Sequence, residues 1–482
     1  MTPLRIDDGQ QKLVLAPTEG LPILAYWGPS LPMGEDLVQL ALLGVNDLNG
    51  GVLDRLAPLT LCPVGDGVFQ GQHAREVASA TGTPLVPRFA SATATVTYSA
   101  FAVEAVDMAL GLTYRARIAL VGGVVELSSE LVSTQAVRLR WLAAPVFQIA
   151  LGLDEVIEFS GKWIGEFHTT RQPFSPGARL REARSGRSGQ EVPPFAILAE
   201  KGTTNTAGAA VALAYGWPGG HRMIAEELPC GRRQVQFGHV AGSEPLGVHF
   251  TTATLTAARS DCGLNGCATL MQTYVRDHLV PWQGAKRPRP VHYNCWEAVY
   301  FKHDLATLSD MAKRAAVLGA EQFVLDDGWF GRRNDDTTSL GDWTVDARKW
   351  PDGLKPLIDA VKAQGIAFGL WVEPEMVNAD SDLYRAHPDW ILGAADQVTG
   401  RGQLVLNLGM PAVRDHLFEC LSALLNAYEI DFLKWDHNRV LQPTAIAWPQ
   451  RVENRPADPV RPKFDDQGLA AAVRMACHHV GR

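Results

Sequence analysis

Several features that mark particular classes of protein are missing from this sequence. It has no block of Lys and Arg, and its net charge of −8 argues against a nucleic-acid partner. No uninterrupted apolar run reaches the ~20 residues that a membrane span needs. The N-terminus lacks a basic start followed by a long apolar run, so no signal peptide is predicted. We therefore expect a cytoplasmic protein with neither a nucleic-acid nor a membrane partner.

Cysteine is scarce and scattered. The chain of 482 residues contains seven, an odd number, and only Cys262 and Cys267 lie close together. A zinc site would usually need a second such pair or nearby histidines. The thiols are therefore predicted to stay free in a reducing cytoplasm, with no metal bound to them.

The first half of the chain is rich in predicted β structure. The length predicts at least two domains. Apolar and polar positions alternate repeatedly in Ala100–Leu131, Val137–Trp141 and Arg232–Phe237. Such period-two segments, broken by Gly, Pro and Ser, are typical of half-buried antiparallel strands. Residues 1–280 are therefore predicted to form a large β-sandwich.

The pattern changes around Asp277–Pro290, where prolines and cations indicate a linker. Beyond it, short apolar segments alternate with helical ones. The predicted strands are Val291–Trp296, Gln322–Leu325, Ala367–Trp371, Gln403–Leu406 and Asp431–Lys434. Alternation at this repeat length predicts parallel strands and, as the simplest closure, a (β/α)8 barrel. An open doubly wound sheet is the alternative, but no glycine-rich phosphate loop follows the first strand.

Local signals place the helices between these strands. Asp304 is a predicted N-cap, and Gly319 ends the same predicted helix. The apolar face of that helix comprises Leu305, Leu308, Met311, Ala312 and Ala315. A second helix is predicted over Leu354–Gln364. A third is predicted to start at Pro411, which suits a first helical position.

The number of predicted strands falls short of a full barrel. A complete barrel takes about 250 residues, or roughly 30 for each strand–helix unit. Residues 443–467 are rich in proline and poor in strand patterns, and one small helix is predicted over Gly468–Val480. The expected organisation is a sandwich over residues 1–280, the first five strands of an incomplete (β/α)8 barrel over residues 281–440, and an atypical tail over residues 441–482.

The stretch Asp431–Arg439 starts as an apolar strand and turns abruptly polar. A spacing of two places Lys434 and Asp436 on the same face of a strand. In a barrel of alternating strands and helices, catalytic groups lie at the carboxyl ends of the strands. The Lys434 ammonium favours the ionised form of Asp436, which suits a nucleophile. The stretch therefore predicts an enzyme in which Asp436 is the attacking group.

Three other strand ends carry polar and aromatic residues. They are Asn294–Glu297, Asp326–Trp329 and Trp371–Glu375. Carboxylates accept hydrogen bonds from hydroxyls, and indole faces cover the apolar face of a pyranose. Together, these strand ends indicate a sugar pocket.

Each of these groups also has a structural interpretation. Asp326 and Asp327 suit helix caps or metal ligands. Glu373 and Glu375 suit ion pairs with arginines of the barrel. The tryptophans of the second and third strand ends suit packing inside the barrel. All of these roles stay open for the single residues, but their gathering at successive strand ends favours a site.

Six motifs follow one another in the C-terminal half. They are Asn294-Cys-Trp296-Glu-Ala, Val324-Leu-Asp326-Asp327-Gly-Trp-Phe, Gly341-Asp-Trp343, Trp350-Pro-Asp-Gly-Leu354, Leu370-Trp371-Val-Glu-Pro-Glu-Met-Val377 and Phe432-Leu-Lys434-Trp-Asp436-His-Asn438-Arg439. Upstream lie Gly161-Lys-Trp163 and Gly263-Leu-Asn-Gly266. In this order, over most of residues 20–440, they resemble the α-galactosidases of glycoside hydrolase family 36.

The resemblance implies a β-supersandwich followed by a (β/α)8 barrel. It also implies retaining hydrolysis of terminal α-galactosyl residues from oligosaccharides such as melibiose and raffinose. Transferred motif by motif, it makes Asp436 the nucleophile with Lys434 beside it, and it assigns the galactose 4- and 6-hydroxyls to Asp326 and Asp327. The further residues that it assigns to the substrate pocket are Trp296, Trp371, Arg401 and Asn438.

The resemblance implies no metal and no organic cofactor. Members of the family are often homotetramers in which an N-terminal loop approaches a neighbour's active site. In this chain that role falls to the region Leu61–Gln72.

One part of the family pattern is missing. The general acid/base aspartate belongs to a Ser-Gly-Gly-Gly-Arg-x-Asp stretch downstream of the nucleophile, and no such stretch follows Asp436. Asp465 and Asp466 are the only adjacent acids there. We therefore expect the acid/base to be absent from the chain. Two alternatives stay open, namely a non-catalytic galactoside-binding or vestigial protein and a galactosyl-transferring enzyme of the raffinose-synthase kind.

Overall fold

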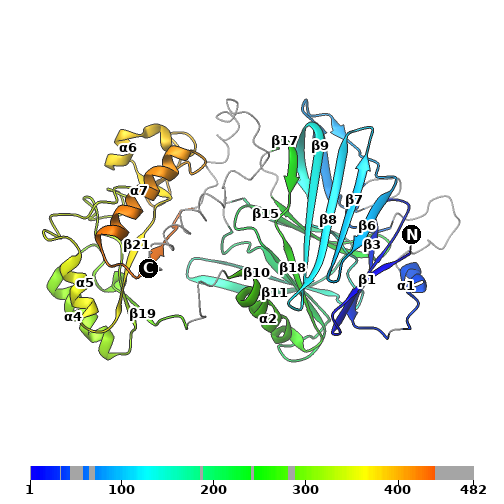
Figure 1. Ribbon diagram of the computed structural model, residues 1–482, viewed down its shortest axis with the longest axis horizontal. Helices are drawn as coiled ribbons and strands as arrows, with labels where there is room; N and C mark the ends of the chain where they lie inside the picture. Colours follow the sequence, from blue (N-terminus) through cyan, green and yellow to red (C-terminus); the bar gives the residue numbers. More distant parts are fainter. Residues whose placement is uncertain are drawn as a thin grey trace. The chain divides into compact units, whose positions relative to one another are not determined.

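The computed structural model describes residues 2–32, 34–43, 58–64, 71–184, 188–239, 244–280 and 288–439. They fall into two compact units, the N-terminal unit up to residue 280 and the C-terminal unit from residue 288 to residue 439 (Figure 1). The predicted tail 441–482 lies outside the described residues.

The N-terminal unit is built from antiparallel sheets. The path of the largest sheet is β11 (Gly165–Pro173), β10 (Glu155–Lys162), β13 (Phe195–Ala199), β14 (Ala210–Tyr215), β18 (Leu255–Ser260), β9 (Val124–Leu142), β8 (Leu112–Val121), β7 (Ala100–Asp107) and β6 (Ala92–Val96). Strands attached to this path are β4 (Arg75–Ser79), β5 (Pro84–Leu85) and β17 (Leu246–Thr251). The long strands β7, β8 and β9 lie side by side in Figure 1.

Two smaller sheets complete the described part of this unit. The first comprises β1 (Leu4–Asp7), β2 (Gln11–Ala16) and β3 (Ile23–Pro29). The second comprises β12 (Gly177–Ala183), β15 (His221–Glu227) and β16 (Arg233–His239). Side chains of both sheets share one apolar core with the large sheet, so the predicted β-sandwich is confirmed.

The alternation in the sequence places this core. In β7 the side chains of Phe101, Val103 and Ala105 are buried, whereas Ala102 and Glu104 between them are exposed. This is the period-two burial of a strand that has one face on the core. The predicted segments Ala100–Leu131, Val137–Trp141 and Arg232–Phe237 accordingly fall largely within β7, β8, β9 and β16.

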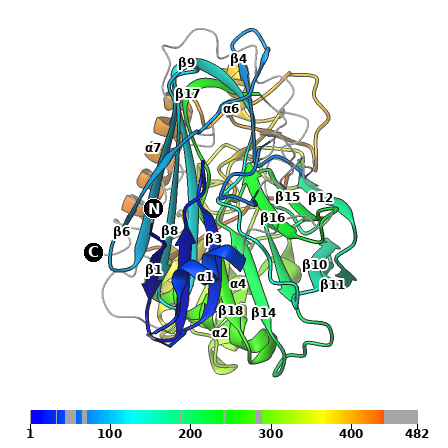
Figure 2. The ribbon, with the colours of Figure 1, turned by 90° about the vertical axis from the view of Figure 1, so that its right-hand side faces the viewer.

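Two helices accompany the sheets of the N-terminal unit. Helix α1 (Leu37–Leu43) contacts β3, as Figure 2 shows. Helix α2 (Gly263–Tyr274) packs on β18 and continues as a π-helical turn, Val275–Leu279. Gly263 has φ +75°, and a Cβ there would lie 2.5 Å from the backbone nitrogen of Ala207. The close approach therefore requires glycine at the start of the Gly263-Leu-Asn-Gly266 motif.

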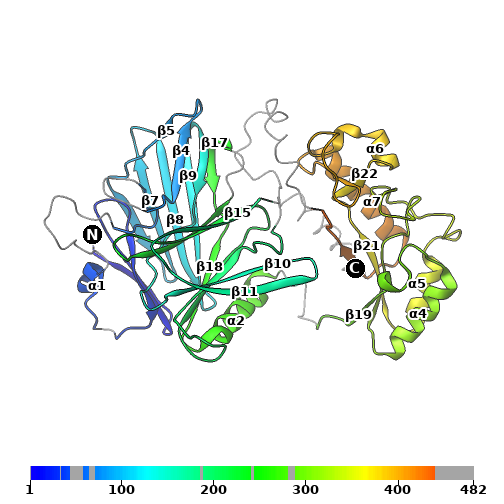
Figure 3. The same cartoon turned by 180° about the vertical axis from the view of Figure 1, so that it is seen from behind.

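The C-terminal unit contains a parallel sheet with helices in its connections. Its strand order is β19 (His292–Asn294), β20 (Gln322–Leu325), β21 (Ala367–Val372) and β24 (Phe432–Trp435). The connecting helices are α3 (Trp296–Val299), α4 (Leu305–Val317), α5 (Lys355–Lys362), α6 (Asp382–Ala386), the 3-10 turn Pro388–Trp390 and α7 (Pro411–Ala427). Figure 3 shows α4 and α5 together at one side of this unit. The described strands form part of a barrel.

The predicted positions of the helices in this unit are confirmed, but of the predicted apolar face of α4 only Leu308, Ala312 and Ala315 are buried, and Leu305 is exposed. Asp304 caps α4 with its side chain, and Pro411 is the first residue of α7. The predicted helix Leu354–Gln364 corresponds to α5. No helix in the described ranges is long and apolar enough to cross a membrane.

One predicted barrel strand is wrong. The segment Gln403–Leu406 was expected to be the fourth parallel strand, but β23 (Gln403–Val405) pairs antiparallel with β22 (Met376–Asn378) in a separate ribbon. β21 pairs directly with β24 instead. The described barrel part therefore has four strands, where five were predicted.

Candidate active site

The parallel register brings the predicted site residues to one edge of the sheet. Leu325 on β20 pairs with Leu370 on β21, and Trp371 pairs with Lys434 on β24. Because all three strands run the same way, the residues that follow them meet at the carboxyl edge. Asp326, Asp327 and Asp436 are the first residues beyond β20 and β24.

One ammonium lies between two of these carboxylates. Lys434 Nζ donates to Asp326 Oδ2 at 2.7 Å and lies 3.9 Å from Asp436 Oδ2. Asn294 Nδ2 also donates to Asp326 Oδ2, at 2.5 Å. The Asp326 side chain is 3% exposed and that of Asp436 is 29% exposed. Asp436 is therefore the carboxylate of this pair that a ligand can approach.

The Asp436 carboxylate is held by its neighbours. Trp371 Nε1 donates to Oδ2 at 2.9 Å, and the backbone N–H of His437 donates to Oδ1 at 2.9 Å. Burial raises the pKa of Asp436, but hydrogen bonds from the Trp371 and Asn438 side chains and the charge of Lys434 outweigh it and leave the pKa below its ordinary value. An ionised carboxylate is suited to nucleophilic attack.

Asp327 is fixed more deeply in the protein. Its side chain is buried and is held by the guanidinium of Arg333, whose Nη2 lies 2.8 Å from Oδ2. Burial raises the pKa of Asp327, and the Arg333 charge offsets only part of that rise. The Asp327 backbone N–H donates to Asp326 Oδ1 at 2.9 Å and so helps to orient the Asp326 carboxylate, whereas Arg333 orients that of Asp327.

The tryptophans have different positions from those expected of a sugar platform. Trp371 is 2% exposed, and its ring is stacked at 6.1 Å on Phe330. Trp329 is fully buried and donates from Nε1 to the Trp371 carbonyl at 2.9 Å. Both therefore pack inside the unit, and Trp371 acts on the site through its N–H. Trp296 is half-buried, with its ring against Phe301 at 5.0 Å.

Arg401 and Asn438 are the two remaining residues of the predicted pocket. Asn438 lies two residues beyond Asp436, and its side chain lowers the pKa of that carboxylate. Arg401 is exposed, and its Nη2 donates to Asp336 at 3.1 Å. Within the described residues, its ion-pair partner is Asp336 and none of the three strand-end aspartates. The structure thus joins Asp326, Lys434, Asp436 and Trp371 by direct contacts. Asn438 lies two residues beyond Asp436, and Asp327 is joined to Asp326 through its backbone N–H and to Arg401 only through other residues.

Among the described residues, Glu373 and Glu375 form no ion pair with an arginine, and that alternative interpretation is wrong for this part of the chain. Glu373 accepts hydrogen bonds from the Asn438 backbone N–H and from Gln403 Nε2. Glu375 accepts from Trp435 Nε1 at 2.9 Å and lies 3.2 Å from His437 Nδ1. Both carboxyls therefore hold the segment that carries Asp436. The sequence motif predicted that Glu373 and Glu375 lie near the site, but only the structure shows that they bond to residues 435–438.

Two further residues of the site were not assigned a role from the sequence. Asn294 bonds to Asp326, and its position directly before the motif's Cys and Trp was a signal for it. Arg333 bonds to Asp327, and nothing in the sequence distinguishes it from the adjacent Arg332, which is exposed. Within the described residues, no group of three or more His, Cys, Asp and Glu side chains has the arrangement of a metal site.

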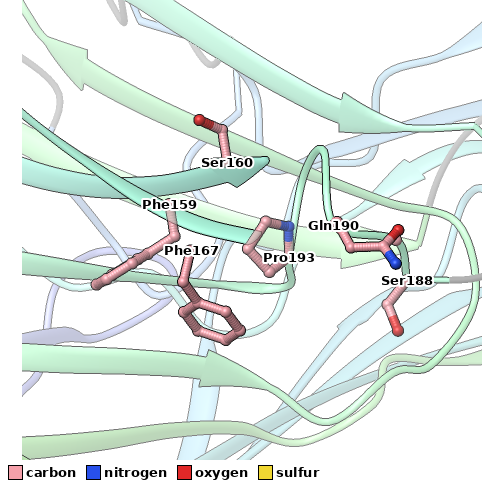
Figure 4. A pocket seen from close by; sticks show the side chains of 7 residues that line it. Phe159, Ser160, Phe167, Ser188, Gln190 and Pro193 are labelled. Atoms are coloured by element: carbon pink, nitrogen blue, oxygen red, sulfur yellow. The ribbon is translucent and has the colours of Figure 1, made fainter. Parts of the chain in front are cut away.

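A hollow in the N-terminal unit has none of these residues in its lining. We call it the N-terminal hollow, and Figure 4 shows its lining. It is lined by Phe159, Ser160, Phe167, Ser188, Gly189, Gln190 and Pro193. The lining includes the hydroxyls of Ser160 and Ser188, but none of its side chains exchanges a proton near neutral pH, so the lining contains no general base to activate them.

Comparison with known proteins connects these residues to a family. Two family models match, the glycosyl hydrolase family 36 N-terminal domain over residues 20–246 and Melibiase over residues 249–458. The α-galactosidase of Escherichia coli is 43% identical over 299 residues, which is 61% of this chain and 42% of that protein. The bifunctional alpha-galactosidase/sucrose kinase AgaSK of Mediterraneibacter gnavus is 39% identical over 303 residues, which is 62% of this chain and 32% of that protein. Each match spans less than half of the relative.

Solved structures match over nearly the whole chain. The galactosidase domain of AgaSK gives a TM-score of 0.84 at 26% identity, covering 99% of this chain and 69% of that chain. A variant of α-galactosidase AgaA from Geobacillus stearothermophilus was solved in complex with raffinose. It gives a TM-score of 0.84 at 26% identity, and the match covers 99% of this chain and 70% of that chain. Because both domain models match in order along the chain, and the solved relatives share its fold, this protein belongs to glycoside hydrolase family 36.

Proposed function

We propose that this chain is a retaining α-galactosidase that releases terminal α-galactosyl residues from oligosaccharides such as melibiose and raffinose. One observation carries the proposal: Lys434 Nζ bonds to Asp326 at 2.7 Å and stands 3.9 Å from the half-buried carboxylate of Asp436. The relatives named α-galactosidases, and the one solved with raffinose, support the choice of sugar and linkage.

In this proposal Asp436 attacks the anomeric carbon and forms a covalent glycosyl intermediate, which water then hydrolyses. Its low pKa keeps it ionised for the attack. Asp326 and Asp327 accept hydrogen bonds from the galactose 4- and 6-hydroxyls, and the Lys434 ammonium offsets the charge of the neighbouring carboxylates. The remaining pocket residues of the proposal are Trp296, Trp371, Arg401 and Asn438.

We assign the general acid/base to none of the described residues. Retention needs a second carboxyl about 5 Å from the nucleophile. In this proposal Asp326 and Asp327 bind the galactose hydroxyls. Glu373 and Glu375 hold the segment that carries Asp436 through their hydrogen bonds to Asn438 and Trp435. Asp465 and Asp466 lie outside the described residues.

The nucleophile can be tested separately from the acid. An aryl α-galactoside with a very acidic phenol needs no protonation to depart, so the first step depends on Asp436 alone. We expect the chain to release the phenol and to form a covalent adduct with a mechanism-based fluorosugar, and we expect Asp436→Ala to do neither. The control is Asp359→Ala, which removes an exposed carboxylate paired with Lys355.

Mass spectrometry of the labelled chain gives the answer. An adduct on Asp436→Ala would refute the assignment of the nucleophile. Calorimetric binding of galactose by a chain that forms no adduct would instead favour the non-catalytic binding protein.

We also propose a cytoplasmic location and a homotetramer. Thiols at Cys230, Cys262, Cys267, Cys295 and Cys420, none of them in a disulfide, support a reducing compartment. Of the proposed contact region Leu61–Gln72, residues 65–70 lie outside the described residues. Cell fractionation and light scattering test the location and the assembly, and a monomer in solution would overturn the tetramer.

A further inference from the structure

A buried arginine stands behind the carboxylate of Asp327. The Arg333 side chain is 1% exposed, and it donates from Nε to Oδ1 at 2.9 Å and from Nη2 to Oδ2 at 2.8 Å. Its guanidinium carbon lies 5.5 Å from the ring centre of Phe301 and 5.9 Å from that of Phe330. Lys349 Nζ donates to the Arg333 carbonyl at 2.7 Å, so the backbone of Arg333 is held as well.

The next residue in this network is Asn378, at the end of β22. It is fully buried, and its Oδ1 accepts from Arg333 Nη1 and from the Leu340 backbone N–H, both at 2.9 Å. Its Nδ2 donates to the carbonyls of Asp336 at 3.1 Å and Gly402 at 2.9 Å. An amide side chain has two donor and two acceptor positions, and all four are used here.

The network ends at the turn that carries Arg401. Gly402 is the neighbour of Arg401, and the turn is closed by the Gln403 N–H on the Gly400 carbonyl at 2.9 Å. Arg401 has φ +54°, and its Nη2 donates to Asp336 at 3.1 Å. A left-handed backbone is unfavourable for a residue with a side chain, so it persists only where its surroundings hold it.

We infer that Arg333 and Asn378 are positioning residues of the candidate active site. Through them, the Asp327 carboxylate and the Arg401 turn belong to one buried hydrogen-bond network, which fixes the spacing of two sugar-binding groups before the substrate enters. The inference rests on the proposed function, because it assumes that the galactosyl group binds at Asp327 and Arg401.

Preorganisation of this kind lowers the cost of binding, because the groups that meet the ligand are already ordered. The ion pair also sets the charge of Asp327. Removing the guanidinium leaves a buried carboxylate without its partner, which raises its pKa further and favours the neutral form. Among the described residues, the other charged groups that act on Asp327 or Arg333 are Asp326, Asp335, Asp336, Lys349 and Glu373.

The test compares two adjacent arginines in the full chain. Arg333→Met removes the buried guanidinium, and Arg332→Met removes an exposed one that is paired with Asp380 at the surface. The probe is a mechanism-based fluorogalactoside that labels Asp436. The labelling rate, measured at several probe concentrations, gives the apparent dissociation constant and the maximum labelling rate separately.

For Arg333→Met we expect the apparent dissociation constant to rise at least about tenfold at neutral pH. The maximum rate should change less, because Asp436 keeps its own partners. Affinity should recover as the pH rises and Asp327 ionises, a dependence that a purely structural defect would not produce. Arg332→Met should stay within about twofold of the parent, as expected for a surface ion pair.

Arg333→Lys is the second variant, for the case in which Arg333→Met does not fold. It restores the charge without the paired geometry, so we expect weaker binding with the pH profile of the parent. The inference fails if a folded Arg333→Met, or Arg333→Lys in its place, binds and labels as Arg332→Met does. If the parent itself is not labelled, both the proposed function and the inference fail.

Discussion

At the scale of single residues, Glu373 is a carboxyl whose charge the fold disfavours. Its side chain is 1% exposed, and it accepts hydrogen bonds from the Asn438 N–H and from Gln403 Nε2. Burial, reinforced by the charges of Asp436 and Asp327, raises the pKa of Glu373 to about 7, against the opposing effect of the hydrogen bonds. Folding therefore favours its protonated form.

This shift predicts how stability depends on pH. The pKa rises from 4.5 in the unfolded chain to about 7 in the folded one. The stabilisation from this group is therefore fully present below pH 4.5 and is lost as the pH rises through 7. The loss is on the order of 3 kcal/mol. The loss is measured by comparing the free energy of unfolding in denaturant at pH values from 4.5 to above 7.

The matched variant is Glu373→Gln. Its side chain cannot ionise, so the free energy of unfolding should depend less on pH than in the parent. The new amide can also donate to Gln403 Oε1, a buried atom with no partner among the described residues, once the Gln403 amide is turned over. Glu419→Gln, at an exposed position on α7, should leave the profile as it is. An unchanged slope in Glu373→Gln would assign the pH dependence to other groups.

The sequence predicted which side chains lie together at the strand ends better than it predicted which of them bond to one another. A spacing of two identified Lys434 as a neighbour of Asp436, and the low pKa of Asp436 agrees with the expectation of an ionised carboxylate. The ammonium nevertheless bonds to Asp326, and the hydrogen bonds of Trp371 and Asn438 lower the pKa of Asp436 more than the ammonium does. Spacing within a strand shows which side chains share a face, but the choice of partner depends on neighbouring strands that are distant in sequence.

At the scale of elements, helix α4 begins with a side-chain cap. Asp304 Oδ1 accepts from the backbone N–H groups of Ala306 at 3.0 Å and Thr307 at 3.3 Å. Asp304→Ala should lower the free energy of unfolding by about 1 kcal/mol, the usual value of an N-cap. Asp310→Ala removes only an exposed ion pair with Arg314 and should cost about 0.3–0.5 kcal/mol. Equal losses in urea unfolding would show that the cap stabilises the helix no more than the surface ion pair does.

The pairing of the strand Gln403–Val405 could not be predicted from the local sequence pattern. Gln403–Val405 is short and buried, and Met376–Asn378 is too. A buried three-residue strand has the same apolar pattern in a parallel barrel as in an antiparallel ribbon, so its composition does not determine its partner. Caps and first-turn prolines were predictable because the groups that they satisfy lie within one turn in the sequence.

At the scale of the whole molecule, the described residues form separate cores. The large core of the N-terminal unit contains Phe101 and Phe237, and the core of the C-terminal unit contains Phe323 and Phe368. No residue belongs to both cores among the positions that the structure describes. Phe101→Ala and Phe323→Ala should each cost about 3–5 kcal/mol in their own unit. In calorimetry, each variant should move a different unfolding transition, and the pair thereby assigns the two transitions to the two units.

With the transitions assigned, galactose shows which unit binds the sugar. A ligand that binds only the folded state stabilises it by about 2.7 kcal/mol at a hundred times its dissociation constant. The site around Asp436 lies in the C-terminal unit, so excess galactose should raise only the transition that Phe323→Ala moves. Asp327→Ala should abolish that rise, because it removes a proposed partner of the sugar hydroxyls. A rise in the other transition would instead place the sugar in the N-terminal unit, where the N-terminal hollow offers aromatic and amide side chains, and would contradict the proposed site.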